Sequence, residues 1–73
     1  MKTIGSNMQE RDTDDGTVLY SYFTPVAIKL KDGDGCLKTN ESFSRTTSRH
    51  ITKWLDGAIA TPVDHSYFKR FAV

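Results

Sequence analysis

The sequence predicts a small α+β domain in which an antiparallel β-hairpin or three-stranded sheet packs against one main helix, with a short helix at the C-terminus. Three patterns predict this fold: apolar and polar residues alternate over 17–31, an amphipathic stretch covers 46–55, and a helix-start pattern covers 61–64. A chain of 73 residues is near the lower size limit for independent folding, so it is one domain. We expect residues 1–15 to form a polar N-terminal arm, which is either flexible or contains a short edge strand around 6–11 that turns at Asp14-Asp15-Gly16, and residues 16–73 to form the domain.

The alternation predicts a half-buried antiparallel strand. One parity is shared by Val18, Tyr20, Tyr22, Val26, Ile28 and Leu30. The parity is kept across Pro25, so we expect one long strand or two collinear strands, with Pro25 at an edge or a bend. The main helix is expected to cover the even-numbered face. Leu19 and Phe23 fall on the opposite, polar face, where they are either covered by another element or exposed for a partner.

A hairpin turn is predicted at Asp32-Gly33-Asp34-Gly35, followed by a short returning strand from Cys36. The Asp-x-Asp spacing is also found in calcium loops. Counting from Asp32, however, position twelve is Phe43 rather than a bidentate Glu, so we interpret the segment as a turn.

The main helix is predicted over 46–55. Ile51, Trp54, Leu55 and Ala58 form one apolar stripe, hydroxyl residues supply an N-cap, and Gly57 suits a left-handed C-terminal residue.

A second helix of about ten residues is predicted near the C-terminus. Thr61 is a suitable cap, Pro62 suits the first helical position and Asp64 suits the positive end of the helix dipole. Val63, Tyr67 and Phe71 recur every four residues and form an apolar side, with Phe68 beside them.

No motif predicts catalysis, a cofactor or a metal site. A nucleophile elbow, a phosphate-binding glycine loop and metal-ligand spacings are all missing from the sequence. His50, His65 and Cys36 are interpreted as packing, capping or exposed residues. A single cysteine excludes an internal disulfide, and no apolar run has the length of a signal peptide or a membrane span, so we expect a cytoplasmic protein.

The main helix carries the most concentrated positive charge. Arg45, Arg49 and Lys53 recur every four residues, and the hydroxyls of Thr46 and Ser48 lie near the helix N-terminus, where the dipole favours anions. Residues 37–73 have six basic and three acidic groups, whereas residues 1–36 have four basic and six acidic groups. Three interpretations stay open for this face: an acidic protein surface, a nucleic-acid backbone, or solvent.

Residues 17–57 resemble a group of small uncharacterised proteins encoded by bacteriophages and related mobile elements. The resemblance lies in two stretches, YSYFTPVA at 20–27 and SRTTSRHITKWL at 44–55, which fit the pattern YSYxTPVA … SxTTSxHIxx[WF]L. It draws attention to Ser44, Thr46, Thr47, Ser48 and His50. These residues would serve either a surface contact or the helix cap.

The resemblance implies a phage accessory protein that binds and inhibits host machinery, such as a defence complex of the CRISPR type. The leading hypothesis is therefore a non-enzymatic inhibitor in the host bacterial cytoplasm whose partner is a host protein or ribonucleoprotein. The expected partner-binding residues are Arg45, Arg49, Lys53, Thr46, Ser48 and Phe23, with Tyr67 or Phe68 as a further exposed aromatic position. The alternative is a small nucleic-acid-binding accessory protein that contacts phosphates through the basic helix. Either protein could form a homodimer by pairing edge strands.

Overall fold

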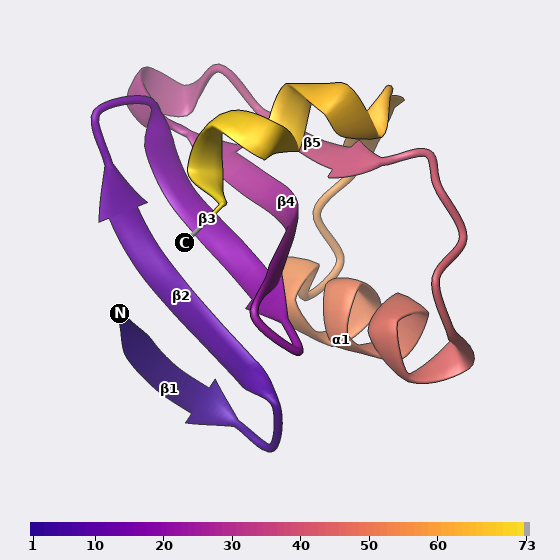
Figure 1. The fold of residues 1–73 in the computed structure, drawn as a ribbon. Helices are drawn as coiled ribbons and strands as arrows, with labels where there is room; N and C mark the ends of the chain where they lie inside the picture. Colours follow the sequence, from indigo (N-terminus) through magenta and orange to yellow (C-terminus); the bar gives the residue numbers. More distant parts are fainter. Residues whose placement is uncertain (73) are drawn as a thin grey trace.

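The protein is a six-stranded mixed sheet with one α-helix and one 3-10 helix packed on it, as a computed structural model describes it for residues 1–72 (Figure 1). Val73, the last residue of the predicted domain, lies outside the described residues. The strands are β1 (Lys2–Gly5), β2 (Met8–Thr13), β3 (Gly16–Ser21), β4 (Thr24–Leu30), β5 (Cys36–Thr39) and β6 (Ala60–Val63). The helices are α1 (Arg45–Leu55), η2 (His65–Phe71) and the single 3-10 turn η1 (Lys31–Gly33).

The strands follow one another across the sheet in chain order. Strands β1 to β5 form an antiparallel meander, whereas β6 returns parallel to β5 after the chain has crossed over through α1. The predicted fold class, a hairpin or three-stranded sheet on one main helix with a C-terminal helix, is therefore wrong. The sheet is larger and mixed, and it dominates the fold.

The predicted long strand is two strands joined by a tight turn. Ser21 and Thr24 pair across β3 and β4, and Tyr22 and Phe23 alone form the loop between them, with φ values of 52° and 65°. Positive φ at both central residues is the geometry of a type I′ hairpin turn, for which Asn-Gly is the usual sequence. Because two aromatic residues occupy these positions, the sequence gives no turn signal there.

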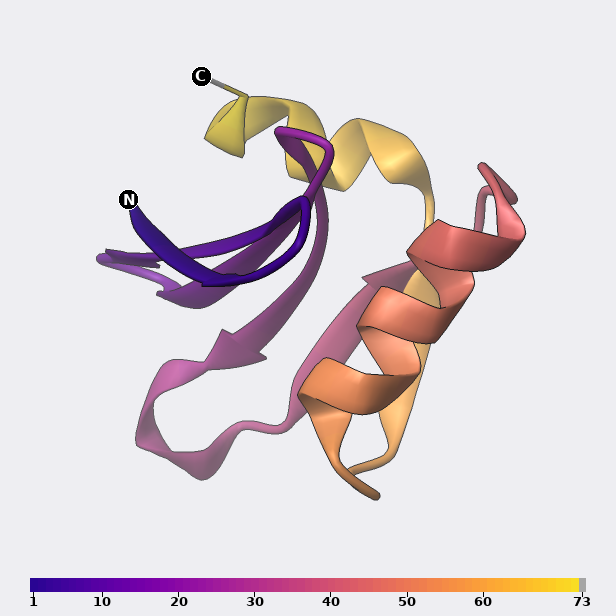
Figure 2. The same ribbon diagram turned by 90° about the horizontal axis from the view of Figure 1, so that it is seen from below.

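Each face of the sheet is covered by a different element (Figure 2). The core under α1 contains Met8, Leu19, Val26, Ala27, Ile51, Trp54 and Leu55. The core under η2 contains Val18, Tyr20, Ile28, Phe68 and Phe71. Most of the even-numbered residues therefore lie under η2, and the expectation that the main helix covers them is wrong.

An irregularity in β4 explains why Val26 leaves its predicted face. Leu19 pairs with Ala27 but Tyr20 pairs with Pro25, so Val26 is an extra residue in β4. Such a β-bulge interrupts the alternation. Val26 and Ala27 consequently both contribute to the core under α1.

Helix α1 agrees closely with the prediction. The Ser44 hydroxyl accepts a hydrogen bond from the Thr47 backbone N–H, as an N-cap does, and Asp56 and Gly57 end the helix in left-handed conformations. The indole N–H of Trp54 donates to Glu10 on β2, which attaches the helix to the sheet. No helix within residues 1–72 is long and apolar enough to cross a bilayer.

The predicted start of the second helix is instead an edge strand. Thr61 and Pro62 lie in β6 and pair with β5, and the helix begins only at His65, capped by Asp64. Pro62 cannot donate to a ladder, but β6 is the last strand of the sheet, where proline is tolerated.

Two turns lie together at one end of the sheet. The β2–β3 turn carries Asp14 and Asp15, and the β4–β5 turn carries Asp32 and Asp34 where the sequence predicted a hairpin. The Lys31 backbone N–H donates to the Asp15 carbonyl and joins them. Residues 2–13, which we expected in the N-terminal arm, supply β1 and β2.

Candidate functional site

The β3–β4 turn holds two bulky residues in an unfavourable backbone conformation. Tyr22 and Phe23 both lie in the left-handed region, which disfavours residues other than glycine by about 1–2 kcal/mol each. Their side chains contribute little to the core, since Tyr22 is 49% exposed and Phe23 is 64% exposed. Strained residues of this kind cluster at ligand clamps and other functional sites, so the turn is a candidate.

A chain of hydrogen bonds attaches the β3–β4 turn to α1. The Ser44 hydroxyl donates to Thr47 Oγ1 over 3.2 Å, and Thr47 Oγ1 lies 3.1 Å from Ser21 Oγ. Ser21 Oγ in turn lies 2.8 Å from Nδ1 of His50. One arrangement of protons, running from Ser44 to His50, satisfies all three hydroxyls. The turn is also braced from the other side, because the Tyr22 backbone N–H donates to the Asn7 carbonyl.

A pocket of about 250 Å³ opens between the turn and the start of α1. It is lined by Ser21, Tyr22, Thr24, Val26, Phe43, Ser44 and Thr47. We call it the turn–helix pocket. The Ser21 side chain is only 2% exposed, and its oxygen is within hydrogen-bonding distance of two partners. The Ser21–His50 pair therefore positions the turn rather than presenting a nucleophile to a substrate.

Exposed aromatic residues line or adjoin this pocket: Tyr22 and Phe43 line it, and Phe23 follows Tyr22 in the turn. We call Tyr22, Phe23 and Phe43 the aromatic rim; Phe43 is 45% exposed. Two of these residues are held by histidines: Tyr22 lies against His50 with ring centroids 5.9 Å apart, and Phe43 meets His65 edge-on at 4.9 Å. In the sequence, Phe23 stands between the pocket residues Tyr22 and Thr24, and its side chain is the most exposed of the rim.

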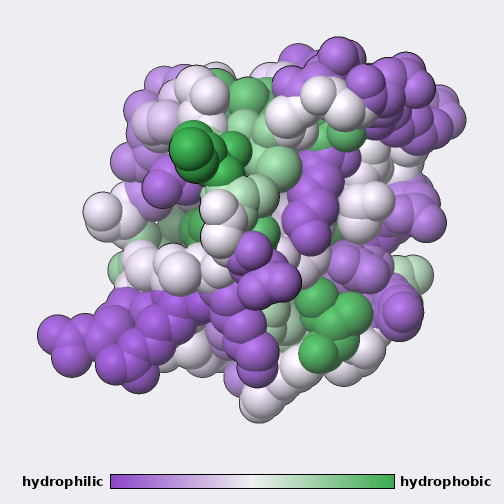
Figure 3. Space-filling view, turned by 180° about the vertical axis from the view of Figure 1, so that it is seen from behind, coloured by the Kyte–Doolittle hydropathy of each residue, from purple (hydrophilic) through white to green (hydrophobic). Residues whose placement is uncertain are grey.

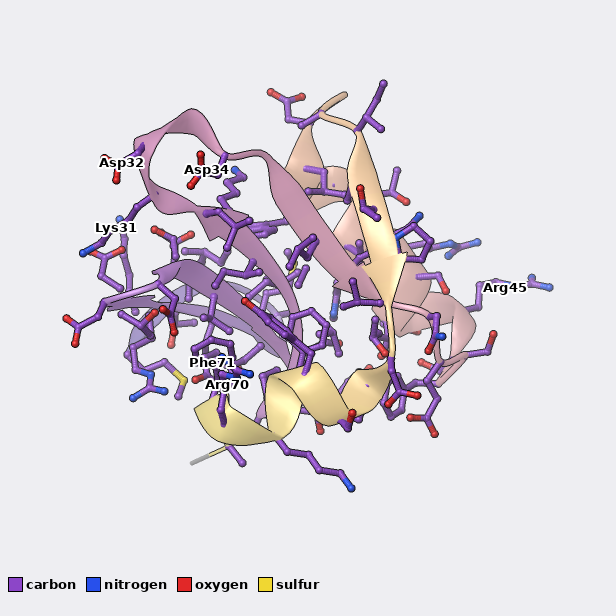
Figure 4. All side chains as sticks on the ribbon, turned by 90° about the horizontal axis from the view of Figure 1, so that it is seen from above. Lys31, Asp32, Asp34, Arg45, Arg70 and Phe71 are labelled. Carbon is purple, nitrogen blue, oxygen red and sulfur yellow. The ribbon has the colours of Figure 1, made fainter. Side chains whose placement is uncertain are left out.

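The predicted basic residues lie together on the outer side of α1. Arg45, Arg49 and Lys53, which we call the basic stripe, line a shallow hollow with Ser48 and Thr52. All three cations are exposed. Arg45 extends from the end of the molecule opposite Asp32 and Asp34 (Figure 4).

The structure brings together most, but not all, of the residues proposed from the sequence. Thr46 is exposed on α1 but does not line the hollow with Ser48. Phe23 lies on a separate element, the β3–β4 turn. Across residues 1–72, no three His, Cys, Asp or Glu side chains gather in a way that could hold a metal ion.

The pocket itself was not predicted from the sequence. Its walls come from both stretches that carry the phage resemblance: Ser21, Tyr22 and Thr24 from the first, and Ser44 and Thr47 from the second. Both stretches stand out in the sequence, but no sequence signal marks the strained turn that brings them together. The hydroxyls Ser44 and Thr47 serve the helix cap and the pocket at once.

The side of the molecule opposite the view of Figure 1 is mostly hydrophilic, with apolar side chains in separate patches (Figure 3). The fold and the pocket thus define a small mixed-sheet domain with a recessed site between a strained hairpin turn and a helix.

The chain belongs to the family of unknown function DUF8033, whose model matches residues 1–70. The match includes β1, β2 and most of η2, which lie outside the stretch that carries the phage resemblance. Searches among curated proteins and among solved structures gave no match.

Proposed function

We propose that this protein is a non-enzymatic binding module that docks on a host protein or ribonucleoprotein through the aromatic rim and the basic stripe. The observation that carries the proposal is the β3–β4 turn. Tyr22 and Phe23 occupy left-handed positions and remain about half exposed or more, so folding does not account for the Phe23 ring or for the exposed part of the Tyr22 ring. A binding role explains why aromatic side chains occupy these positions, because exposed aromatic residues are frequent anchors of interfaces.

The basic stripe provides a second, charged surface on the outer side of α1. Arg45 directly follows Ser44, a residue of the pocket wall, so the two surfaces meet at the start of the helix, and Arg49 and Lys53 extend the positive charge along α1. Exposed charges of this kind steer encounter with a partner of opposite charge. The resemblance to phage proteins supports an inhibitory role against host machinery, of the anti-CRISPR type, in the host bacterial cytoplasm.

The second candidate function is binding of a nucleic acid through the basic stripe. It is favoured by three cations on one side of a helix and by the exposed ring of Phe43 two residues before Arg45, because cations and aromatic rings together suit single strands. This function requires an affinity that falls steeply with salt concentration.

Homodimerisation remains a weaker proposal. Strands β1 and β6 are the free edges of the sheet. Exposed Leu19 and Phe23 would have favoured self-association. Leu19 is buried under α1, however, and of the two only Phe23 is exposed.

The test is capture of partners from bacterial lysate by the tagged protein, with and without nuclease treatment. We expect a specific partner that survives nuclease and is lost with Phe23→Ala. The matched control is Ile59→Ala, because Ile59 is 91% exposed and does not line the pocket. Capture that does not depend on Phe23 would contradict the proposal. Loss of every partner after nuclease would favour nucleic acid.

A further inference from the structure

We infer that the turn–helix pocket and the basic stripe together receive an acidic protein segment. One apolar side chain of the segment enters the pocket, and carboxylates that flank it contact Arg45 and Arg49. This inference rests on the proposed function and names the class of partner that the site takes.

The pocket chemistry favours an apolar group. Its walls include Tyr22, Val26 and Phe43. Three of its hydroxyls are already occupied: Ser44 donates to Thr47 and accepts from the Thr47 backbone N–H, while Thr47 and Ser21 lie within hydrogen-bonding distance of one another. A polar group such as a base edge would therefore lose its bonds to water and gain few in return. A volume of about 250 Å³ is sufficient for one large side chain.

The charge at the N-terminal end of α1 favours carboxylates. Arg45 begins α1 immediately after the pocket residue Ser44, and Arg49 follows one turn later. Both arginines lie on the outer side of the helix, away from the buried Thr47, so the segment reaches them by passing from the pocket over the start of α1. The first turn of α1 contains no acidic residue, so the positive end of the helix dipole adds to these charges. Glu41, in the loop before the helix, is the one acidic residue between β5 and α1. Arginine suits carboxylates because its planar guanidinium donates two parallel hydrogen bonds.

The distribution of charge disfavours a long polyanion. Asp14, Asp15, Asp32 and Asp34 lie on turns at one end of the molecule, and Arg45 extends from the other (Figure 4). The backbone extends 28 Å along its longest axis, which is more than three times the screening length of about 8 Å at physiological ionic strength. The acidic end and the basic end therefore attract partners independently of each other. A nucleic acid lying across the molecule would meet the acidic turns, whereas a short acidic segment would meet only the basic end.

The experiment is selection of a library of short random peptides against the full chain at physiological ionic strength. Enriched peptides are then labelled, and their affinities for wild-type and variant chains are measured by fluorescence anisotropy. Thr24→Trp fills the pocket from its wall, and Arg45→Glu with Arg49→Glu reverses the charge. Lys69→Glu is the matched charge control, because Lys69 is exposed on η2. A single-stranded oligothymidylate is the nucleic-acid probe.

We expect the enriched peptides to combine acidic residues with an apolar one. Their binding should weaken at least about tenfold with the double charge reversal and with Thr24→Trp, and should not change with Lys69→Glu. If Thr24→Trp does not fold, Phe43→Ala removes the opposite pocket wall from an exposed position and should weaken binding likewise.

Three results would overturn the inference: enrichment of peptides without acidic residues, no enrichment at all, or tighter binding of oligothymidylate to the same residues. If lysate capture still depended on Phe23 in those cases, only the class of partner would be wrong. Capture that is independent of Phe23 would instead remove the proposed function.

Discussion

The hydroxyl oxygen of Ser21 lies 2.8 Å from Nδ1 of His50, and this contact joins the end of β3 to the middle of α1. Ser21 is the last residue before the strained β3–β4 turn, and His50 also lies against the ring of Tyr22 within that turn. The helix therefore holds the turn in place through one polar and one aromatic contact.

Removal of this polar contact should destabilise the protein. In Ser21→Ala, Thr47 Oγ1 loses a buried partner and His50 Nδ1 loses a partly buried one, at a cost of about 1–3 kcal/mol in the free energy of unfolding. The measurement is urea denaturation followed by Trp54 fluorescence. Ser42→Ala, in the exposed loop before α1, is the control and should leave the midpoint unchanged. Equal midpoints for the two variants would show that the hydroxyl chain does not stabilise the turn.

The C-terminal helix depends on one buried hydroxyl. The Tyr20 hydroxyl donates to the Phe71 carbonyl over 2.6 Å, and the Arg11 guanidinium donates to both of these oxygens. Tyr20→Phe should therefore reduce the free energy of unfolding by about 1–2 kcal/mol and loosen η2. Hydrogen exchange should become faster in residues 65–71 but not in α1. Tyr67→Phe is the control, because Tyr67 contributes to this helix through ring contacts. Unchanged exchange in η2 would contradict the assignment.

The N-cap of η2 gives the stability a specific pH dependence. The Ser66 backbone N–H donates to Asp64 and, with smaller effects of Lys69 and His65, holds the pKa of Asp64 below its ordinary value of 3.8. The folded state thus binds this proton less tightly than the unfolded state. The stabilisation is complete above the ordinary pKa and is lost as the pH falls through the lowered one. Denaturation midpoints of Asp64→Asn should fall less between pH 5 and pH 2 than those of wild type. Parallel pH profiles would contradict this.

The elements that the sequence predicts well are those whose local signals agree with their tertiary environment. Helix α1 has its own apolar stripe, and Ser44 caps it in the structure as the hydroxyl pattern indicates. The turn around Gly33 and Gly35 is likewise specified by residues that tolerate positive φ.

The elements that the sequence mispredicts depend on contacts between distant segments. Tyr22 and Phe23 adopt a glycine-like conformation because β3 and β4 pair on either side of them, which no local pattern encodes. Thr61 and Pro62 have the local pattern of a helix start, yet pairing with β5 makes them a strand. The pocket could not be predicted for the same reason, because it exists only where the β3–β4 turn meets α1.

Charge reversal on the basic stripe should separate binding from folding. Arg49→Glu with Lys53→Glu changes two exposed residues, so the free energy of unfolding should change by no more than about 0.5 kcal/mol. Capture of the partner should be lost, because the stripe would then repel an acidic surface. Circular dichroism, denaturation and capture are compared for the same preparations. Capture at the wild-type level would remove the stripe from the interface.

The most direct test of the binding account is replacement of Tyr22 and Phe23 by Asn and Gly, the residues that a type I′ turn prefers. Both changes relieve backbone strain of about 1–2 kcal/mol each, which exceeds the about 0.5–1.5 kcal/mol lost with the Tyr22–His50 ring contact, so the free energy of unfolding should rise by about 1–2 kcal/mol. Removal of the aromatic rings should abolish partner capture. A more stable protein that no longer binds is the predicted result. A variant that captures the partner as well as wild type would contradict the account, because the aromatic turn would then have no role in binding.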